Sequence, residues 1–422
     1  MRDEIPATIE EEAMSLSRKG FLKMLGVGAL AAGSNAYGLP SKALQDARAA
    51  SATTGPAKKL KITDVEIYLF DIALTSPFRI AIGVMNAAND VLVRVRTDQG
   101  IVGLGEACPF PPITGETQAT NVAAARAIRD MIVGKDPLAI DDLLRLIGPI
   151  VHSNPSVVAA FDMALFDILG KVAGLPLFRL LGGTKNVFET DITTGIDTLD
   201  AMRAEAKKYA GMGYKTLKVK VGLDPDEDFA RLEAIRNAVG PDAAIRIDAN
   251  QGWSVPQAIY ALRKMEPLAI QFCEQPVLAS DHAGMSAVRA QSPISIMADE
   301  ALFGPADAIN LIRAEACDTF NIKLMKAGGI LNSIRIAHVA DAANMRCMVG
   351  CMIESNLALT AAAHVVASQA NIVYADLDGN TEHATNPIIG GMTVKAGTLT
   401  LPETPGLGCD VDPAFLKKLQ KV

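Results

Sequence analysis

Two lysines stand at alternate positions in the otherwise apolar segment TLKVKVG, residues 216–222. Side chains alternate across a β-strand, so Lys218 and Lys220 point to one side of it and the apolar residues beside them point to the other. A lysine titrates at about pH 10.4 and is charged at neutral pH, so two ammonium groups on one side of an apolar strand are unusual. The pair indicates either proton-transfer chemistry or a strand that is exposed at the edge of a sheet.

Acidic side chains recur at the ends of the following segments with strand character. They are Asp248 in AIRIDAN (244–250), Glu274 in IQFCEQP (270–276) and Asp299 in ISIMADE (294–300). One such acid alone is often a helix cap or a surface ion pair, but acids on three consecutive strands of a barrel converge on one point. Oxygen ligands without cysteine or histidine favour Mg²⁺ or Mn²⁺ over zinc. The sequence therefore predicts a divalent metal site, with Asn250 and Glu300 beside its ligands.

A third lysine, Lys323, lies in the segment TFNIKLM, residues 319–325. In a barrel this sixth strand faces the second strand, which carries Lys218 and Lys220, and the metal-bearing strands lie between them. Lysines on opposite sides of a metal-held substrate could remove and replace a proton on either face of one carbon. Because Lys218 packs beside Lys220 near a cation, we expect the second charge to be disfavoured and a free amine to be available.

The elements that position these residues alternate regularly from residue 186 onward. Strands are expected at 189–196, 216–222, 244–250, 270–276, 294–300, 319–325, 346–352 and 371–379, with amphipathic helical segments between them. A spacing of roughly 25 residues predicts a parallel β/α barrel, whose functional residues lie at the C-terminal ends of the strands. An open doubly wound sheet is the alternative, but no G-x-G-x-x-G follows any of these strands.

The segments on either side of the barrel have a different pattern. Short strands from about residue 60 to 100 precede helical segments at 117–182, which is typical of a small α+β domain. The tail returns to strand-and-turn patterning. We therefore expect a capping domain over 60–183, the barrel over 184–384 and a C-terminal segment over 385–422 that packs on the capping domain.

Composition and charge narrow the class of function. The chain has 422 residues and a net charge of −7, which argues against nucleic acid as a partner because phosphate binding needs a basic surface. Half of the residues are hydrophobic, as expected for a well-packed globular enzyme. The six cysteines lack the spacing of a zinc site or a disulfide framework, so we expect most of them to be small core residues.

The first 36 residues have the layout of an export signal. The segment SRKGFLKMLGVGALAAGSNA (17–36) has a basic start, a short apolar run and small residues at its end. It resembles a twin-arginine signal, S-R-R-x-F-L-K, with Lys19 in place of the second arginine. We expect an exported, periplasmic protein with a flexible linker at 37–59 and no stable membrane span. A buried N-terminal helix is the alternative.

Taken as a set, these residues resemble the enolase superfamily, and within it the muconate-cycloisomerase-like subgroup. The resemblance covers nearly all of residues 60–410. It is carried by AFDMALFDILGKVAGLPLFRLLGG (160–183), the K-x-K at Lys218, D-A-N-x-x-W at 248–253, EQP at Glu274, ADE at Asp299 and NIK at Lys323. It implies a modified (β/α)7β TIM-like barrel with an N-terminal α+β capping domain completed by the C-terminal tail, in a homo-oligomer.

The resemblance also implies roles for these residues. Asp248, Glu274 and Asp299 would bind one Mg²⁺ per subunit, which Mn²⁺ could replace. Lys220 and Lys323 would be the two acid/base catalysts, and Lys218 would tune Lys220 and polarise a carboxylate. The shared chemistry is proton abstraction next to a carboxylate, through an enediolate that the metal stabilises.

Within the subgroup, the segment YADLDG (374–379) resembles the D-x-D of the dipeptide epimerases. Asp376 and Asp378 project to the same side of a strand and could grip a cation, which in that family is the α-ammonium of the substrate. The segment GCMIES (350–355) resembles the family's strand-seven loop around the dipeptide backbone, which makes Met352 and Glu354 candidate substrate contacts. The predicted function is therefore Mg²⁺-dependent epimerisation at the α-carbon of the C-terminal residue of a dipeptide, by two lysines.

The sequence says less about which side chain that C-terminal residue carries. Family members that take a C-terminal glutamate carry an arginine a few residues past the P-F pair of a capping-domain loop, here within 76–90. This chain has no basic residue from Ile80 through Val93, and only Arg79 is a candidate. An uncharged side chain is therefore favoured over glutamate, and an exposed strand charge is the alternative reading of Arg79.

Two other kinds of function stay open from the sequence. On the same scaffold, the chain could be an N-acylamino-acid racemase, a cycloisomerase or an enzyme like o-succinylbenzoate synthase, none of which needs an ammonium grip. A protein that binds peptides without catalysis is the alternative of another class. The complete set of carboxylates and lysines argues against that second alternative.

Overall fold

The computed structural model describes residues 59–149 and 153–422. The expected export signal, and the expected linker up to residue 58, lie outside the described residues. Among the described residues, no helix is both long enough and apolar enough to cross a membrane.

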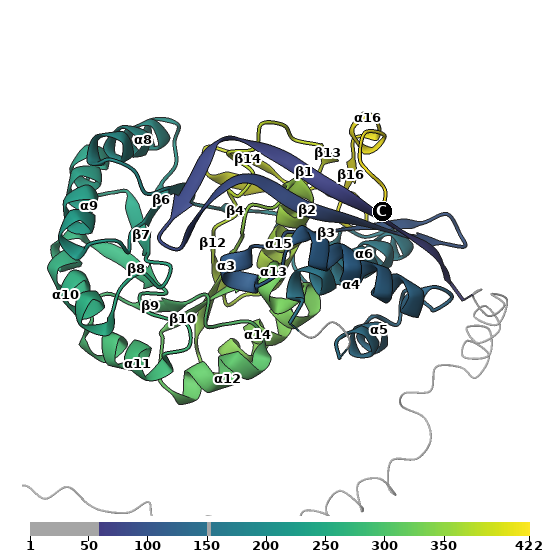
Figure 1. The fold of residues 1–422 in the computed structure, drawn as a ribbon, viewed down its shortest axis with the longest axis horizontal. Helices are drawn as coiled ribbons and strands as arrows, with labels where there is room; N and C mark the ends of the chain where they lie inside the picture. The colour runs from purple at the N-terminus through teal and green to yellow at the C-terminus, as the bar shows by residue number, and fades with distance from the viewer. Residues whose placement is uncertain (1–58, 150–152) are drawn as a thin grey trace, which may run out of the picture. The chain divides into compact units, whose positions relative to one another are not determined.

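A three-stranded antiparallel sheet with helices packed on it precedes the barrel (Figure 1). Its elements are β1 (Ile62–Ile80), β2 (Gly83–Thr97), β3 (Val102–Ala107), α3 (Pro111–Thr114), α4 (Gln118–Ile132), α5 (Ile140–Ile147), α6 (Pro155–Ala173) and α7 (Leu177–Leu180). Strand β3 lies close against α6 because Gly103 and Gly105 have no side chain. A Cβ at Gly105 would lie 1.8 Å from the carbonyl oxygen of Ala160.

Eight parallel strands form the second sheet, in the order β12-β11-β10-β9-β8-β7-β6-β5. They are β5 (Ile192–Thr194), β6 (Thr216–Lys220), β7 (Ala244–Asp248), β8 (Ile270–Glu274), β9 (Ile296–Ala298), β10 (Thr319–Lys323), β11 (Arg346–Gly350) and β12 (Ile372–Ala375). All eight coincide with the expected segments, although each is shorter. The predicted fold class, a modified (β/α)7β barrel with an N-terminal capping domain, is confirmed.

Helices connect the barrel strands and lie outside them, as α8 to α12 show most clearly in Figure 1. They are α8 (Leu199–Gly211), α9 (Pro225–Val239), α10 (Val255–Met265), the 3₁₀ helix η1 (Glu266–Leu268), α11 (His282–Gln291), α12 (Pro305–Arg313), α13 (Leu324–Ala327), α14 (Ile330–Ala342) and α15 (Asn356–Ser368). Strand β6 therefore lies inside a covered sheet, between β5 and β7, and Lys218 is only 2% exposed. The exposed edge strand considered for the lysine pair is wrong.

The last segment contacts the capping domain. It contains β13 (Ile388–Gly390), β14 (Thr393–Lys395), β15 (Thr398–Thr400), β16 (Cys409–Val411) and α16 (Pro413–Leu416), and β15 also pairs with β4 (Val187–Glu189). The backbone N–H of Val422 donates to the carbonyl of Ile67 on β1 at 2.9 Å. On α6, the Asp167 carboxylate accepts from the N–H groups of Leu104 and Leu407, which links β3 to this segment.

Candidate active site

Parallel strand pairing brings the predicted metal ligands to one level of the barrel. Lys220 is the register partner of Asp248, and Asp248 is the register partner of Glu274. Asp248 and Glu274 end β7 and β8, and Asp299 directly follows β9. Because neighbouring parallel strands lie about 4.8 Å apart, side chains at the same level of adjacent strands meet above the end of the barrel.

The three carboxylates form a group that fits a hard divalent cation. Each offers an oxygen within 4.8 Å of the others, and all three residues are buried. Glu274 Oε2 and Asp299 Oδ2 accept no hydrogen bond from a described residue, although ammonium groups lie 3.0 and 2.8 Å away. A group of carboxylate oxygens without nitrogen or sulfur ligands suits a hard cation such as Mg²⁺.

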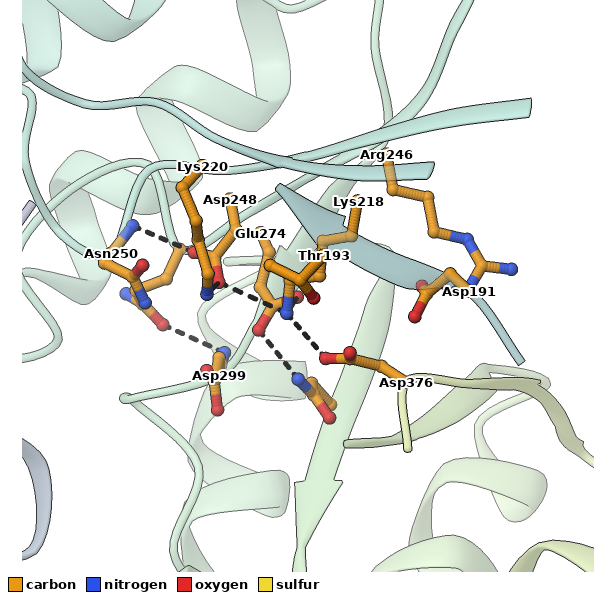
Figure 2. Close-up of polar contacts among 12 residues, drawn as sticks. Asp191, Thr193, Lys218, Lys220, Arg246, Asp248, Asn250, Glu274, Asp299 and Asp376 are labelled. Carbon is orange, nitrogen blue, oxygen red and sulfur yellow. Dashed lines mark hydrogen bonds and ion pairs between the residues drawn. The ribbon is translucent and has the colours of Figure 1, made fainter. Parts of the chain in front are cut away.

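The lysines approach this group from its two ends. Lys220 Nζ lies 2.6 Å from Asp248 Oδ2 on one side, and Lys323 Nζ lies 2.8 Å from Asp299 Oδ2 on the other. Strands β7, β8 and β9 separate β6 from β10 in the sheet. The two ammonium groups therefore flank the carboxylate group, and Figure 2 shows Lys220 beside Asp248.

The electrostatics of the lysines differ from the expectation. Burial by itself would lower the pKa of Lys218, but the carboxylates of Asp376, Glu274 and Asp248 raise it well above its usual value. The pKa of Lys323 is raised in the same way, chiefly by Asp299. Within the protein alone, the surrounding carboxylates outweigh the repulsion between neighbouring ammonium groups that would free an amine.

The carboxylates are not evenly neutralised. Burial would raise the pKa of Asp248 and of Asp299, but the nearby lysines lower both. The pKa of Glu274, between them, is raised well above its usual value by burial and by the charge of Asp248. Without a cation, the central carboxyl group therefore favours its protonated form, and a divalent cation that binds there would displace this proton.

Three further side chains hold the metal-site carboxylates, and the sequence analysis did not single them out. Lys326, on α13, is fully buried and forms an ion pair with Asp299 Oδ1. Gln275 Oε1 accepts from the N–H of Asp299 at 3.0 Å, and Asn321 Nδ2 donates to Glu274 Oε1 at 2.7 Å. Lys326 had a readable signal, a charge within the apolar run LMKAGG, whereas neither amide stands out by type.

Asn250 and Glu300 lie beside the ligands, where the sequence analysis expected them. The Asn250 N–H donates to Asp248 Oδ1 at 2.9 Å, and its side-chain amide donates to Glu300 Oε1 at 3.1 Å. Asn250 has a φ of 40°, in the left-handed region that asparagine tolerates better than most residues. Burial raises the pKa of Glu300 to about 7.

The D-x-D segment closes the site at the end of β12. Asp376 Oδ2 lies 2.7 Å from Lys218 Nζ, and Asp378 Oδ2 accepts from the Thr193 N–H at 2.5 Å. Asp376, Asp378 and Cys351 each offer an atom within 4.8 Å of the others. Burial would raise the pKa of Asp376, but Lys218 and Lys220 lower it to about 2. Burial and the charge of Asp376 raise the pKa of Asp378 to about 6.

Two adjoining cavities contain the lysines. One is lined by both aspartates of the D-x-D together with Leu74, Thr193, Tyr209, Lys218, Lys220, Cys351, Met352, Ile353, Gly379, Thr381 and Glu382. The other is lined by Lys220 and Lys323 with Asn250 and a set of mostly apolar residues, Ile80, Met85, Phe110, Ile113, Cys351, Met352 and Ile353. Met352 lines both cavities, as a candidate substrate contact should.

Two predicted substrate contacts lie elsewhere. Glu354 lines neither cavity; it is 3% exposed and its carboxylate accepts from the Met352 N–H at 2.6 Å. Glu354 therefore stabilises the loop around Met352 without lining the cavities. Arg79 is exposed and lines a groove with Glu205 that shares Thr193 and Glu382 with the D-x-D cavity, whereas side-chain alternation on β1 turns Ile80 toward the lysines.

Comparison with known proteins agrees with this geometry. Residues 63–182 match the N-terminal domain of the mandelate racemase / muconate lactonizing enzyme family, and residues 201–415 match the enolase C-terminal domain-like family. The chain belongs to the enolase superfamily. This membership confirms the predicted superfamily, and the epimerases and racemases among the similar proteins confirm the predicted class of enzyme, an isomerase.

Similar proteins carry related names. A D-Ala-D/L-Ala epimerase of Cytophaga hutchinsonii is 39% identical over 363 residues, which is 86% of this chain and 99% of that protein. A hydrophobic dipeptide epimerase of Enterococcus faecalis is 40% identical, over 83% of this chain and 99% of that protein. An N-succinyl-L-Arg/Lys racemase of Bacillus cereus is 34% identical, over 85% and 98%.

A solved structure extends the likeness to three dimensions. The dipeptide epimerase of Cytophaga hutchinsonii, complexed with Mg and the dipeptide D-Ala-L-Val, superposes with a TM-score of 0.84 over 86% of this chain and 99% of that one. The superfamily's expected metal, Mg²⁺, is thus present in a close structural neighbour.

Proposed function

We propose that the protein is a Mg²⁺-dependent dipeptide epimerase that inverts the α-carbon of the C-terminal residue by a two-lysine 1,1-proton transfer. The observation that carries the proposal is the placement of Lys220 and Lys323 at opposite ends of one carboxylate group, while the D-x-D lines a cavity that shares Lys220 with the cavity of Lys323. The epimerases among the similar proteins support it.

Asp248, Glu274 and Asp299 would hold the metal, and Mn²⁺ would serve as a substitute because it takes the same oxygen ligands. Bound there, the divalent cation supplies a positive charge that offsets the negative charge developing on the substrate carboxylate as the α-proton leaves. Lys218, whose Nζ lies 3.0 Å from Glu274 Oε2, adds a fixed positive charge beside the three metal-site carboxylates.

Lys220 and Lys323 would carry out the proton transfer. An amine on one face of the α-carbon takes the proton, and the ammonium on the other face returns one, so that the configuration inverts. The surrounding carboxylates favour the ammonium forms of Lys218 and Lys323. An ammonium that is the acid in one direction becomes, once deprotonated, the base in the reverse direction.

The D-x-D would select the free amino group of the substrate. An ammonium ion between Asp376 and Asp378 faces two carboxylates, of which Lys218 neutralises one. The apolar cavity over the lysines would take the side chain of the second residue, and it offers no arginine or other cation besides the lysines themselves. An uncharged side chain therefore fits better there than glutamate.

An N-acylamino-acid racemase is the second candidate, favoured by the N-succinylamino-acid racemase among the similar proteins. That reaction uses the same metal site and lysines but brings no substrate ammonium group for Asp376 and Asp378 to bind. A cycloisomerase and an enzyme like o-succinylbenzoate synthase share that difficulty. A non-catalytic peptide-binding protein would use the two aspartates but would leave Lys220 and Lys323 without a catalytic role.

One experiment separates these candidates. Purified protein with Mg²⁺ is incubated in D₂O with a mixed dipeptide library and with N-acylamino acids, and deuterium at the α-carbon is measured by mass spectrometry. We expect a subset of dipeptides with an uncharged second residue to gain deuterium, and Asp376→Asn to suppress that gain. Exchange confined to N-acylamino acids would refute the proposal.

We also propose that the protein is exported to the periplasm, from the signal-like residues 17–36. Sequencing the N-terminus of the protein recovered from the periplasm should show that this segment has been removed. An intact N-terminus on protein found only in the cytoplasm would contradict export. The expected homo-oligomer also stays a prediction, which light scattering of the purified protein would check.

A further inference from the structure

The barrel has a seam next to the D-x-D. Strands β5 and β12 stand at the two ends of the sheet order, and among the described residues no ladder of paired strands joins them. Three hydrogen bonds between described residues cross the gap: the Asp191 N–H donates to the Ala375 carbonyl at 3.3 Å, the Leu377 N–H donates to Thr190 Oγ1 at 2.9 Å, and the Thr193 N–H donates to Asp378 Oδ2 at 2.5 Å. Asp376 lies between Ala375 and Leu377, so the seam determines where its carboxylate stands.

A buried arginine from a third strand spans this seam. Arg246, on β7, places Nη1 2.6 Å from Asp191 Oδ2 and 3.2 Å from the Ala375 carbonyl. Its Nε donates to Gln271 at 2.8 Å, and its guanidinium lies over the ring of Tyr374 at 4.8 Å. One side chain thus holds both edges of the seam, and Figure 2 shows Arg246 and Asp191 facing each other beside Asp376.

The pair also sets the charge beneath the ammonium-binding carboxylates. Asp191 is fully buried, and its Oδ1 accepts no hydrogen bond from a described residue. Burial and the nearby charge of Asp376 raise the pKa of Asp191, and Arg246 opposes them. Without Arg246, the buried carboxyl group of Asp191 would lose its ion-pair partner near Asp376 and Asp378, and the contact with the Ala375 carbonyl would be lost.

We propose that Arg246 and Asp191 form a positioning pair that holds Asp376 in place for the substrate's α-ammonium group. The inference rests on the proposed function, because it assigns the pair to recognition of a free amino group. Neither residue lines the two cavities that contain the lysines, so the pair acts through Asp376 and Lys218 and not on the reacting carbon. Loss of the pair should therefore weaken binding of substrates with an ammonium group.

The test compares two substrates on the Mg²⁺-loaded enzyme. One is an alanyl dipeptide that the wild type epimerises; the other is the N-propanoyl amino acid in which hydrogen replaces the ammonium group. Arg246→Met should raise the dipeptide KM about tenfold or more, while kcat and the KM for the analogue change by less than about threefold. Arg246→Lys, which restores a cation opposite Asp191, should recover part of the dipeptide affinity.

The matched control is Arg289→Met on the outer side of the barrel. Arg289 also lies 2.6 Å from an aspartate, Asp318, but far along the sheet from the D-x-D. This variant should leave the KM of both substrates unchanged even if its melting temperature falls. Equal losses for the dipeptide and the analogue in Arg246→Met, or no change in either, would overturn the inference.

A double variant covers the case in which Arg246→Met does not fold. Arg246→Met combined with Asp191→Asn leaves no unpaired charge and should fold, retain the analogue's exchange and still lose dipeptide affinity, because the contact with Ala375 is gone. A double variant with wild-type dipeptide KM would overturn the inference. Different results would show that the proposed function itself is wrong. In that case the wild type would not exchange the α-proton of dipeptides, or Asp376→Asn would change the KM of both substrates equally.

Discussion

Dipeptide recognition should depend on pH through Asp378. The pKa of this carboxyl group is raised to about 6 by burial and by the charge of Asp376, whereas Lys218 and Lys220 hold the pKa of Asp376 at about 2. Above pH 7 both carboxylates are ionised and face the substrate ammonium. As the pH falls through 6, Asp378 takes up a proton and one of the two charges is lost.

The size of this effect follows from the titration. At pH 5, one unit below the pKa, about one tenth of the Asp378 side chains remain ionised, so the dipeptide KM should rise about tenfold relative to pH 7. Replacing Asp378 with asparagine removes the charge at every pH. Truncating one partner of a desolvated charge pair costs about 2–5 kcal/mol, so Asp378→Asn should raise the KM at pH 7 by about 30-fold or more.

The assay measures kcat/KM for a dipeptide and for its N-propanoyl analogue from pH 5 to pH 7, where the dipeptide's own α-amino group stays largely protonated. Other groups titrate in this range, including Glu300, whose pKa is about 7, but they act on both substrates alike. The ratio of the two kcat/KM values isolates the ammonium-binding carboxylates. The ratio should fall about tenfold between pH 7 and pH 5 in the wild type and stay flat in Asp378→Asn. A flat ratio in the wild type would refute the reasoning.

Three further outcomes are expected. Met85 lines the apolar cavity over the lysines, so Met85→Lys should raise kcat/KM for a dipeptide with C-terminal glutamate about tenfold relative to one with an apolar residue. The same change at the exposed neighbour, Val84→Lys, should have no such effect. An equal effect of both variants would contradict the assignment of the cavity. Chelation of divalent ions should abolish α-proton exchange and Mn²⁺ should restore it, whereas exchange that survives chelation would exclude a required metal. Gly105→Ala should lower the free energy of unfolding by about 1–3 kcal/mol, measured with denaturant, because the added Cβ would meet the Ala160 carbonyl. Gly211→Ala, with open space around it, should not lower it. Equal unfolding midpoints for the two variants would show that β3 and α6 can move apart.

The fold and the reactive residues could be predicted from the sequence because their signals lie within short segments. Alternation of apolar residues, the spacing of the strands and the acids near strand ends are patterns within short segments, and Asp248 and Glu274 are the last residues of β7 and β8. The contacts that cross the barrel were not readable. Arg246 and Asp191 lie 55 positions apart, and only strand closure brings them together.

The placement of two other candidates depends on local geometry. Arg79 was a candidate substrate contact with an exposed strand charge as the alternative, and it is exposed in the groove beside the D-x-D cavity. Glu354 was expected to touch the substrate, but a turn of the loop points its carboxylate back to the Met352 N–H. The raised pKa of Lys218 in the protein without a metal was not predictable either, because the sequence does not show that Lys218 faces Asp248, Glu274 and Asp376 at once.

The most direct test of two-lysine proton transfer is α-proton exchange measured separately for each epimer of one dipeptide. Lys220→Gln and Lys323→Gln should both lose epimerisation. Each variant should still exchange the α-proton of one epimer in D₂O, and the two variants should retain opposite epimers, because each keeps the base on one face of the carbon. Exchange of the same epimer by both variants, or of both epimers by either one, would contradict the assignment of one lysine to each face.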